Sequence, residues 1–186
     1  MPHAPQKELQ SLNIALLTVS DTRTSETDSS GDTLAERLVN AGHHLYERQL
    51  VKDDIWQIRA KISGWIADPQ VQVVLLSGGT GFTARDNTPQ AVAALLDKRV
   101  EGFGELFRQV SINAIGTASL QSRALAGISN GTLVCCLPGS PNACRTAWDE
   151  ILLEQLDSRT TPCNFTPHLK HLIVDPEDRC CESRTE

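Results

Sequence analysis

The sequence lacks any apolar run long enough to cross a membrane. Its longest apolar stretches, residues 71–76 and 132–137, have the length of strands, whereas a spanning helix needs about 20 predominantly apolar residues. The sequence also has no segment that resembles a signal peptide. We therefore expect a protein without a membrane partner.

An excess of positive charge is missing as well, because 17 Lys and Arg residues face 23 Asp and Glu residues and leave a net charge of −6. A domain that binds nucleic acid through general electrostatic attraction usually carries a basic surface, so we expect no nucleic-acid partner. A local phosphate site stays open to this chain, because backbone N–H groups at a helix N-terminus hold an anion without net positive charge.

The six cysteines show no CxxC spacing, which argues against a zinc site and against a thioredoxin motif. Cys135 and Cys136 fall inside a predicted core strand, where cysteine usually acts as a small hydrophobic residue. Free thiols of this kind fit a reducing compartment, so we expect a cytoplasmic protein.

Two common nucleotide-binding motifs are absent or incomplete. A Walker loop is excluded because no GK[ST] follows the glycines. Residues 79–84 match the GxGxxG/A pattern formally, but that fingerprint belongs after the first strand and requires its helix to begin at the glycines. Here residues 85–87 intervene before a new helix start at Thr88-Pro89, so a Rossmann oxidoreductase is a distant alternative.

The sequence does contain a regular alternation of strand and helix patterns. Strands are expected at residues 13–20, 44–51, 71–77 and 132–137, and helices at residues 31–41, 54–67, 88–96, 101–111 and from 141 onward. The near-continuous apolar run at 71–77 is typical of a parallel strand that is covered on both faces. We therefore predict an α/β fold, a three-layer sandwich around a mostly parallel sheet.

Some parts of the chain are less regular. Residues 113–126 fit neither pattern clearly, and Asn130-Gly131 is a turn signal. Residues 1–12 are polar and contain prolines, so we expect a loose N-terminal arm. The domain itself is expected at residues 13–170, and residues 171–186 have the composition of a disordered C-terminal tail.

Four loops should meet at one edge of this sheet, because the carboxyl ends of parallel strands share an edge and ligands bind in the crevice there. These loops contain Ser20-Asp21, Lys52-Asp53-Asp54, Gly78-Gly79-Thr80-Gly81 and Pro138-Gly139-Ser140. Glycine lets the backbone approach a phosphate, and carboxylates hold Mg²⁺, which prefers oxygen ligands and substrate phosphates. A nucleotide or a phosphorylated substrate with Mg²⁺ would use both.

Each loop also has a purely structural interpretation. Gly78–Gly81 could be a tight turn from strand to helix, and Ser20-Asp21 could simply terminate a strand. Asp53 or Asp54 could cap the following helix, although only one of them can be the N-cap.

Residues near the later helix starts also have structural interpretations. Asp86 could form an Asx-turn before Thr88, with Thr88 as N-cap and Pro89 as the first helical residue. Ser140 before Pro141 repeats this device. Arg123 is by default a surface residue, and a phosphate contact is the alternative.

Several segments together resemble the MoaB/MogA family of molybdopterin-binding proteins. They are LLSGGTGFTARDNTPQAV, EGFGELFR, LQSRALAG and LPGSPNACRTAWDEILLEQL, and the ending TTPCNFTPHLK is similar to the MoaB branch of that family. The resemblance extends from about residue 12 to residue 170 and therefore covers most of the chain.

The resemblance implies an α/β fold that assembles into homotrimers or homohexamers. It implies an activity in molybdenum cofactor biosynthesis, the Mg²⁺-dependent adenylylation of molybdopterin by ATP. By position, Asp53 matches the family's essential aspartate and Asp86 the second aspartate, which implies that both are catalytic groups and Mg²⁺ ligands. Ser122 matches a substrate-contacting serine, although this chain has Gln121-Ser122-Arg123 where members often have Leu-Ser-Arg. The alternative is a non-catalytic molybdopterin- or nucleotide-binding protein of the same pathway.

Overall fold

The structure is a computed structural model, and it describes residues 8–171. Residues 1–7 and 172–186 lie outside this range, so the expected arm and tail fall largely outside the described residues. Leu12, the last residue of the expected arm, is fully buried in the core. The division of the chain into arm, domain and tail stays a prediction.

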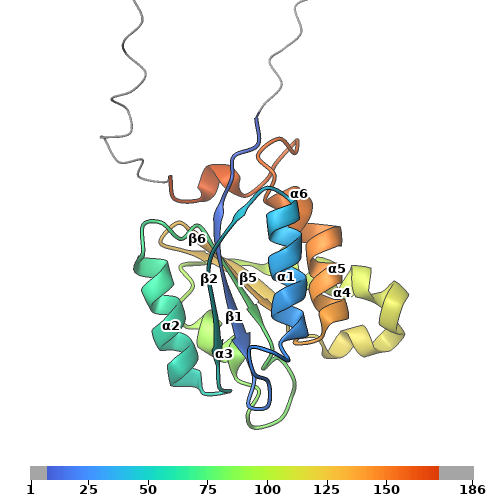
Figure 1. Cartoon of the computed structure of the whole chain (residues 1–186). Helices are drawn as coiled ribbons and strands as arrows, with labels where there is room; N and C mark the ends of the chain where they lie inside the picture. The colour runs from blue at the N-terminus through green and yellow to red at the C-terminus, as the bar shows by residue number, and fades with distance from the viewer. Residues whose placement is uncertain (1–7, 172–186) are drawn as a thin grey trace, which may run out of the picture.

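A six-stranded sheet forms the centre of the molecule, with strand order β2-β1-β3-β6-β5-β4 (Figure 1). Its parallel part consists of β2 (His44–Val51), β1 (Asn13–Val19), β3 (Val73–Ser77) and β6 (Thr132–Leu137). At the other edge, β5 (Leu125–Ser129) and β4 (Lys98–Val100) pair in antiparallel fashion. The predicted mostly parallel sheet is confirmed.

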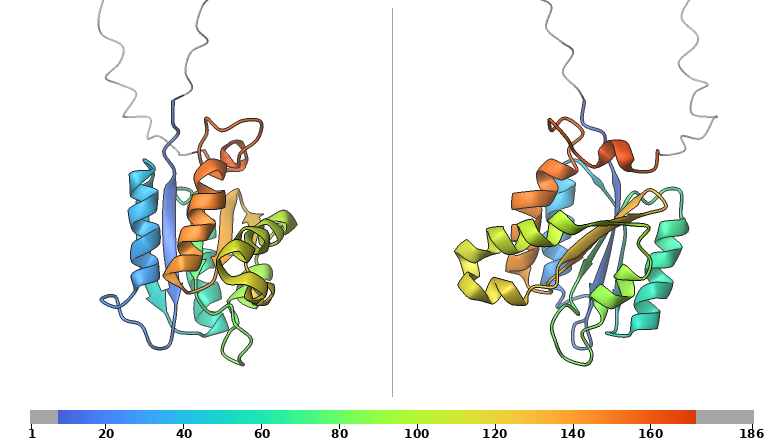
Figure 2. Two further views of the ribbon diagram at one scale, coloured as in Figure 1. Left: turned by 90° about the vertical axis from the view of Figure 1, so that its right-hand side faces the viewer. Right: turned by 180° about the vertical axis from the view of Figure 1, so that it is seen from behind.

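Helices cover both faces of the sheet and make three layers (Figures 1 and 2). One core contains apolar side chains from α1 (Ser29–Asn40), α4 (Glu101–Ile115) and α5 (Pro141–Ala147). The opposite core contains side chains from α2 (Ile55–Ala67) and α3 (Thr88–Ala93).

Strand β3 is apolar from Val73 to Leu76 and buried on both faces of the sheet. Val73 and Leu75 point into the first core, whereas Val74 and Leu76 point into the second. Because successive side chains of a strand point to opposite faces, a strand covered on both faces shows a near-continuous apolar run and no alternation.

The segment that the pattern left ambiguous, residues 113–126, holds three different structures. It contains the end of α4, the 3-10 helix η1 (Gly116–Gln121) and the start of β5. The expected turn at Asn130-Gly131 is confirmed, since both residues have positive φ, 46° and 70°, and they join β5 to β6. Strand β4 was not predicted, because three residues are too few to show a period.

The last long helix begins at Pro141, as predicted. It continues from α5 through a π-helical segment, η2 (Trp148–Leu152), into α6 (Leu153–Gln155). One face of it is buried in the core, with residues Cys144, Ala147, Trp148, Ile151 and Leu152. A short 3-10 helix, η3 (Thr166–His168), follows near the end of the described chain.

Within residues 8–171, no helix combines the length and the hydropathy that a membrane crossing requires. The described chain begins and ends at one end of the sheet, and the carboxyl ends of the parallel strands lie at the opposite end (Figure 1).

Candidate functional site

The ends of three parallel strands meet at Gly78. Its N–H donates a hydrogen bond to the carbonyl of Leu137 at 3.1 Å, its φ is +104°, and a Cβ atom there would lie 2.1 Å from the carbonyl oxygen of Val19. A Cβ on Gly139 would lie 3.0 Å from the Cα of Gly78. The two glycine loops and the end of β1 are therefore in direct contact, which only glycine at position 78 permits. We call this end of the molecule, formed by residues 20–23, 52–54, 78–88 and 138–140, the rim.

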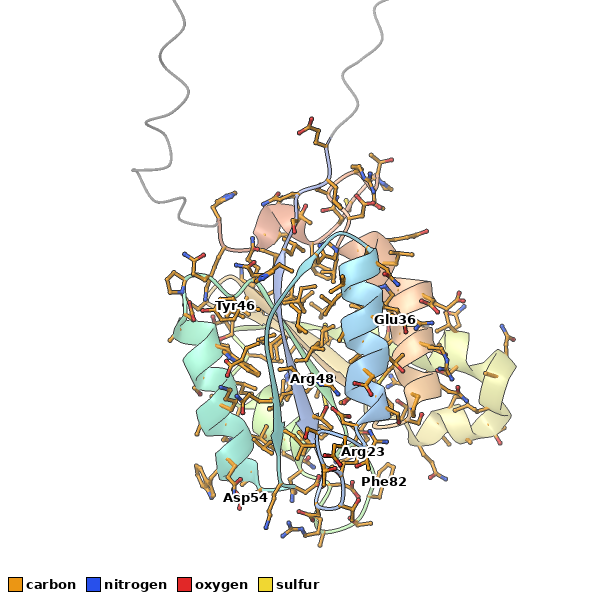
Figure 3. The ribbon with its side chains drawn as sticks, viewed as in Figure 1. Arg23, Glu36, Tyr46, Arg48, Asp54 and Phe82 are labelled. Carbon is orange, nitrogen blue, oxygen red and sulfur yellow. The ribbon has the colours of Figure 1, made fainter. Side chains whose placement is uncertain are left out.

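Residues from separate loops gather at the rim. Figure 3 labels Arg23, Asp54 and Phe82, which follow β1, β2 and β3, at the same end of the sheet. Ser20 has a local role here, since its hydroxyl accepts hydrogen bonds from the N–H groups of Thr22 and Arg23 at 3.3 and 3.1 Å.

Asp21 joins the loop after β1 to the loop after β3. The guanidinium of Arg85 donates to both oxygens of Asp21, at 2.9 and 2.7 Å, and this contact lowers the pKa of Asp21. The N–H of Asp53 also donates to Asp21, at 3.3 Å. Asp21 is therefore a partner of Arg85 and of the β2–α2 loop in this structure.

The adjacent aspartates Asp53 and Asp54 have different environments. Asp54 is the N-cap of α2 and accepts hydrogen bonds from the N–H groups of Trp56 and Gln57 at 3.0 and 2.9 Å. Asp53 does not cap the helix, and its buried Oδ1 has no hydrogen-bond partner. Burial, followed by repulsion from Asp21 and Asp86, raises the pKa of Asp53. Buried polar atoms are normally paired, and unpaired ones with a shifted pKa are found mainly at functional sites. Asp53 is therefore a candidate functional residue.

Asp53 lies directly against the glycine loop. A Cβ atom on Gly79 would be 2.6 Å from Asp53 Oδ1 and 2.2 Å from the hydroxyl oxygen of Thr88. Gly79 also has a φ of +61°. Glycine at this position is therefore required both by the backbone conformation and by two oxygen atoms that occupy the place of a side chain.

The helix start at Thr88-Pro89 differs from the prediction. The N-cap of α3 is Asn87, without a side-chain capping bond, so Thr88 is the first helical residue and Pro89 the second. Thr88 is drawn inward because its N–H donates to the carbonyl of Gly79 at 3.1 Å, and its buried hydroxyl has no partner.

The Asp86 carboxylate turns back on its own loop. It accepts hydrogen bonds from the hydroxyl and the N–H of Thr83, at 2.6 and 2.9 Å, so the Asx-turn considered before Thr88 is wrong. The hydroxyl of Thr83 is the main cause that lowers the pKa of Asp86. Asp86 also lies against Gly81, where a Cβ atom would be 2.7 Å from Asp86 Oδ2.

Arg123, two residues before β5, is hydrogen-bonded to the backbone of the glycine loop. Its guanidinium donates to the carbonyl oxygens of Thr80 at 3.0 Å, of Asp86 at 2.6 Å, and of Gly81, and it lies 5.2 Å from the ring centre of Phe82. Arg123 is thus not a free surface residue, and its contact with a phosphate stays a prediction. It is the clamp that shapes residues 80–86.

The loop after β6 is fixed by its own cap and by α1. The Ser140 hydroxyl accepts from the N–H of Ala143 at 3.1 Å, so its prediction as N-cap is confirmed. The carbonyl of Gly139 accepts from Ser30 at 2.7 Å and from Arg23 at 2.8 Å, and Arg23 is paired with the buried Asp28.

A pocket of about 420 Å³ lies beside the two glycine loops, between them and helices α4, η1 and α5. Five of the predicted residues line it, namely Thr80, Gly81, Ser122, Pro138 and Ser140. Apolar residues such as Phe107 and Ile115 form much of its wall, and Asn142 and Arg145 add polar groups. No Asp or Glu contributes to this lining, so the pocket and the acidic part of the rim are adjacent but distinct.

Residues 15–158 match the model of a family described as "probable molybdopterin binding domain". The chain belongs to this family. It is 54% identical to molybdenum cofactor biosynthesis protein B of Escherichia coli strain K12 over 157 residues, which are 84% of this chain and 92% of that protein. The resemblance stated from the motifs is confirmed.

Solved structures of this family have the same fold. A crystal structure of molybdenum cofactor biosynthesis protein B is 42% identical, with a TM-score of 0.78, and the match covers 81% of this chain and 94% of that one. The tungsten cofactor synthesizing protein MoaB from Pyrococcus furiosus is 34% identical, with a TM-score of 0.70, over 78% of this chain and 92% of that one.

In the present protein, the predicted site residues fall into two groups by position. Asp21, Asp53, Asp86, Gly78 and Gly79 form the acidic part of the rim, whereas Ser122 and the loop of Pro138, Gly139 and Ser140 lie towards the pocket. Thr80 and Gly81 connect the two. Arg85 and Thr88 were missed as site residues, because only the folded chain reveals an ion pair to Asp21 and a buried hydroxyl.

The structure also bears on the expected Mg²⁺. Within residues 8–171, no three His, Cys, Asp or Glu side chains lie close enough to hold a metal ion by themselves. Mg²⁺ in nucleotide sites is usually held by one or two carboxylates, with phosphate oxygens and water completing its shell. Asp53, with its unpartnered oxygen, and Asp86 fit such a shared site.

Proposed function

We propose that this protein binds molybdopterin and Mg²⁺-ATP and transfers AMP from ATP to the terminal phosphate of molybdopterin. The family match and the relatives named for molybdenum cofactor biosynthesis support the pathway. The observation that carries the reaction is the unpartnered oxygen of Asp53, which lies against Gly79 in a glycine loop bordered by a second carboxylate.

The reaction is a nucleotidyl transfer. An oxygen of the molybdopterin phosphate forms a bond to the α-phosphorus of ATP, the bond from that phosphorus to the β-phosphate oxygen breaks, and pyrophosphate leaves. Such transfers need little covalent help from a protein, and positioning with charge neutralisation supplies most of the rate.

The rim contains groups for both tasks. N–H groups of Gly79, Thr80 and Gly81 would bind phosphate oxygens, and Asp53 and Asp86 would hold Mg²⁺, which neutralises phosphate charge when bound. Arg123 keeps the loop in shape through three carbonyl oxygens. Asp53 is the group whose charge is least compensated by the protein, because no hydrogen bond reaches its Oδ1.

The pocket beside the rim is the proposed place for the pterin. Its volume of about 420 Å³ suits a small organic ligand. Ser122 and Asn142 offer hydrogen bonds to a heterocycle, and Phe107 and Ile115 offer an apolar wall. The shared lining by Thr80 and Gly81 would bring the ligand's phosphate to the rim.

A homotrimer or homohexamer is part of the proposal. Helices α4 and η1 project from the body of the molecule (Figure 2), and they expose apolar side chains, with Ile115 54% and Leu120 80% accessible. Exposed apolar side chains that gather on one surface usually mark a protein interface, and we propose that α4 and η1 supply one. Native mass spectrometry should give three or six chains, and a monomer would contradict this part.

The main experiment compares two neighbouring aspartates. We expect the wild-type protein with molybdopterin, ATP and Mg²⁺ to form molybdopterin-AMP, and Asp53→Asn to lower kcat by about 100-fold or more, because a transition-state charge contact is lost. Asp54→Asn is the matched control. Asparagine is an equally good N-cap, so this variant should retain turnover. Wild-type rates in Asp53→Asn would refute the role of Asp53.

A second candidate function is a non-catalytic molybdopterin-binding protein of the same pathway. It is favoured by one observation, that the pocket lining contains no carboxylate. In that case molybdopterin would bind with equal affinity to the wild-type and Asp53→Asn proteins, and neither would form molybdopterin-AMP.

A further inference from the structure

Thr88 is a second buried group at the rim whose polar atom has no partner. Its side chain is fully buried, and its hydroxyl oxygen is one of three buried side-chain atoms without a hydrogen bond among residues 8–171. Two other buried hydroxyls show the usual pairing. Thr18 donates to Asp28 at 2.7 Å, and Ser111 donates to the carbonyl of Phe107 at 2.6 Å.

The second of these three atoms is Asp53 Oδ1, and it lies beside Thr88. Both oxygens lie where a side chain of residue 79 would begin: a Cβ atom on Gly79 would be 2.2 Å from Thr88 Oγ1 and 2.6 Å from Asp53 Oδ1. One is a hydroxyl that can donate, and the other is a carboxylate oxygen that can only accept when ionised. Two unsatisfied and complementary groups on one glycine are unusual, because buried polar atoms are normally paired.

The backbone keeps Thr88 in this place. Its N–H donates to the carbonyl of Gly79 at 3.1 Å, and as the first residue of α3 it has no preceding helical carbonyl to which its hydroxyl could donate. Asp53 is held from its other side, since its N–H donates to Asp21. The backbone of each residue is therefore held in place, and both side-chain oxygens lie on the same side of Gly79.

We propose that Thr88 is a positioning residue for Asp53: the Thr88 hydroxyl donates to Asp53 Oδ1 and so fixes the orientation of the carboxylate that would hold Mg²⁺ beside the bound phosphates. The inference rests on the proposed function, because it assumes that Asp53 faces the reacting groups. Gly79 makes the contact accessible, since any side chain there would separate the two oxygens.

The test uses two substitutions of Thr88. Thr88→Val keeps the shape and removes the donor, and Thr88→Ser keeps the donor and removes a methyl group. We expect Thr88→Val to lower kcat for adenylylation by about tenfold, the effect of one hydrogen bond, with the KM for ATP unchanged. Thr88→Ser should retain nearly wild-type kcat. An Asp53→Asn, Thr88→Val double variant should be no slower than Asp53→Asn alone.

A spectroscopic readout makes the test independent of turnover. The side-chain carboxyl ¹³C resonance of Asp53, assigned by its loss in Asp53→Asn, should differ between wild type and Thr88→Val in the presence of Mg²⁺-ATP, and should be kept in Thr88→Ser. If no protein forms molybdopterin-AMP and the resonance still follows the hydroxyl, the proposed function fails and the pairing holds.

Two results would overturn the inference. In the first, Thr88→Val leaves the Asp53 resonance and kcat unchanged. In the second, Thr88→Val and Thr88→Ser change both quantities equally, which would assign Thr88 to packing. Urea unfolding of both variants serves as the check that each protein is folded.

Discussion

The two glycine loops of the rim, residues 78–87 after β3 and residues 138–140 after β6, start alike and are stabilised differently. Each follows a buried parallel strand and leads to a helix with proline near its start. The short loop is closed locally, since Ser140 caps α5. The long loop has no capping side chain at Asn87 and depends on Arg85 and Arg123 for its shape.

The two loops also differ in whether the polar atoms around them have hydrogen-bond partners. At the short loop, the carbonyl of Gly139 and the hydroxyl of Ser140 all have partners. Beside the long loop, Asp53 Oδ1 from the loop after β2 and Thr88 Oγ1 from the start of α3 lie against Gly79 and have none. A loop built by distant contacts can hold groups in arrangements that local sequence would not stabilise, which is why strain and open polar atoms tend to gather at functional sites.

The largest expected effect comes from adding a methyl group to each loop. Gly79→Ala would meet Asp53 and Thr88 and would force alanine to a φ of +61°, so we expect about 3 kcal/mol of destabilisation. Gly139→Ala has its nearest neighbour at 3.0 Å and should cost about 1 kcal/mol, at the low end of overpacking. Urea unfolding measures both, and equal losses would remove the distinction between the loops.

A third glycine provides the baseline for that pair. Gly64 lies inside α2, and a Cβ atom there would meet nothing within 4 Å. Gly64→Ala should therefore stabilise the protein by about 1 kcal/mol, because alanine is the better helix former.

The next effect concerns the support of the short loop by Asp28. Burial alone would raise the pKa of this carboxyl, but hydrogen bonds from Arg48, Thr18 and the N–H of Gly31 lower it below its ordinary value of 3.8. Its stabilising contribution is therefore complete above pH 3.8 and is lost as the pH falls through the lower pKa of the folded state.

Asp28→Asn removes this carboxylate at every pH. We expect a loss of about 3 kcal/mol at pH 7, because Arg23 and Arg48 both lose a charged partner. The difference from wild type should shrink below pH 3.8, where the wild-type group takes up its proton. A difference that stays constant with pH in acid unfolding experiments would contradict this reasoning.

The clamp on the long loop gives a smaller effect. Arg123→Lys keeps the charge, but an ammonium cannot present the planar fork that reaches three carbonyl oxygens. We expect about 1 kcal/mol of lost stability and faster hydrogen exchange confined to residues 80–87. Exchange that rises equally in residues 138–143 would show that the two loops are not independent.

The smallest effects should come from the caps. Ser140→Ala removes a capping hydrogen bond and should cost about 1 kcal/mol. Asn87→Ala removes only a contact from its amide to the carbonyl of Ala84 and should cost about 0.5 kcal/mol, the low end for one hydrogen bond. Thermal unfolding compares the two, and an equal or larger loss in Asn87→Ala would reverse the comparison.

Much of the fold was predictable because its signals are local. The apolar run of β3 and the turn at Asn130-Gly131 are visible in the sequence, and the bounds of β2 and β6 agree with the prediction to the residue. Strand β4 was not predictable, because Lys98 and Arg99 carry no apolar period and the strand exists only through pairing with β5.

The sequence predicted which loops form the site, but not the role of each side chain in it. Parallel topology places the ends of β1, β3 and β6 together, and the structure brings Gly78, Gly139 and Asp53 to that edge. The sequence could not say which of two adjacent aspartates caps α2, because Asp53 and Asp54 are equivalent as residue types. Their difference arises from the neighbours that each side chain meets.

The sequence alone determined the alternation of strands and helices, the family, and the set of glycine and aspartate loops at one edge, because periodicity and turn chemistry act over a few residues. Only the tertiary structure decided that Arg123 clamps the long loop, that Arg85 pairs with Asp21, and that Thr88 faces Asp53 across Gly79. Each of these depends on atoms far apart in the chain, whose distances exist only when the sheet has assembled.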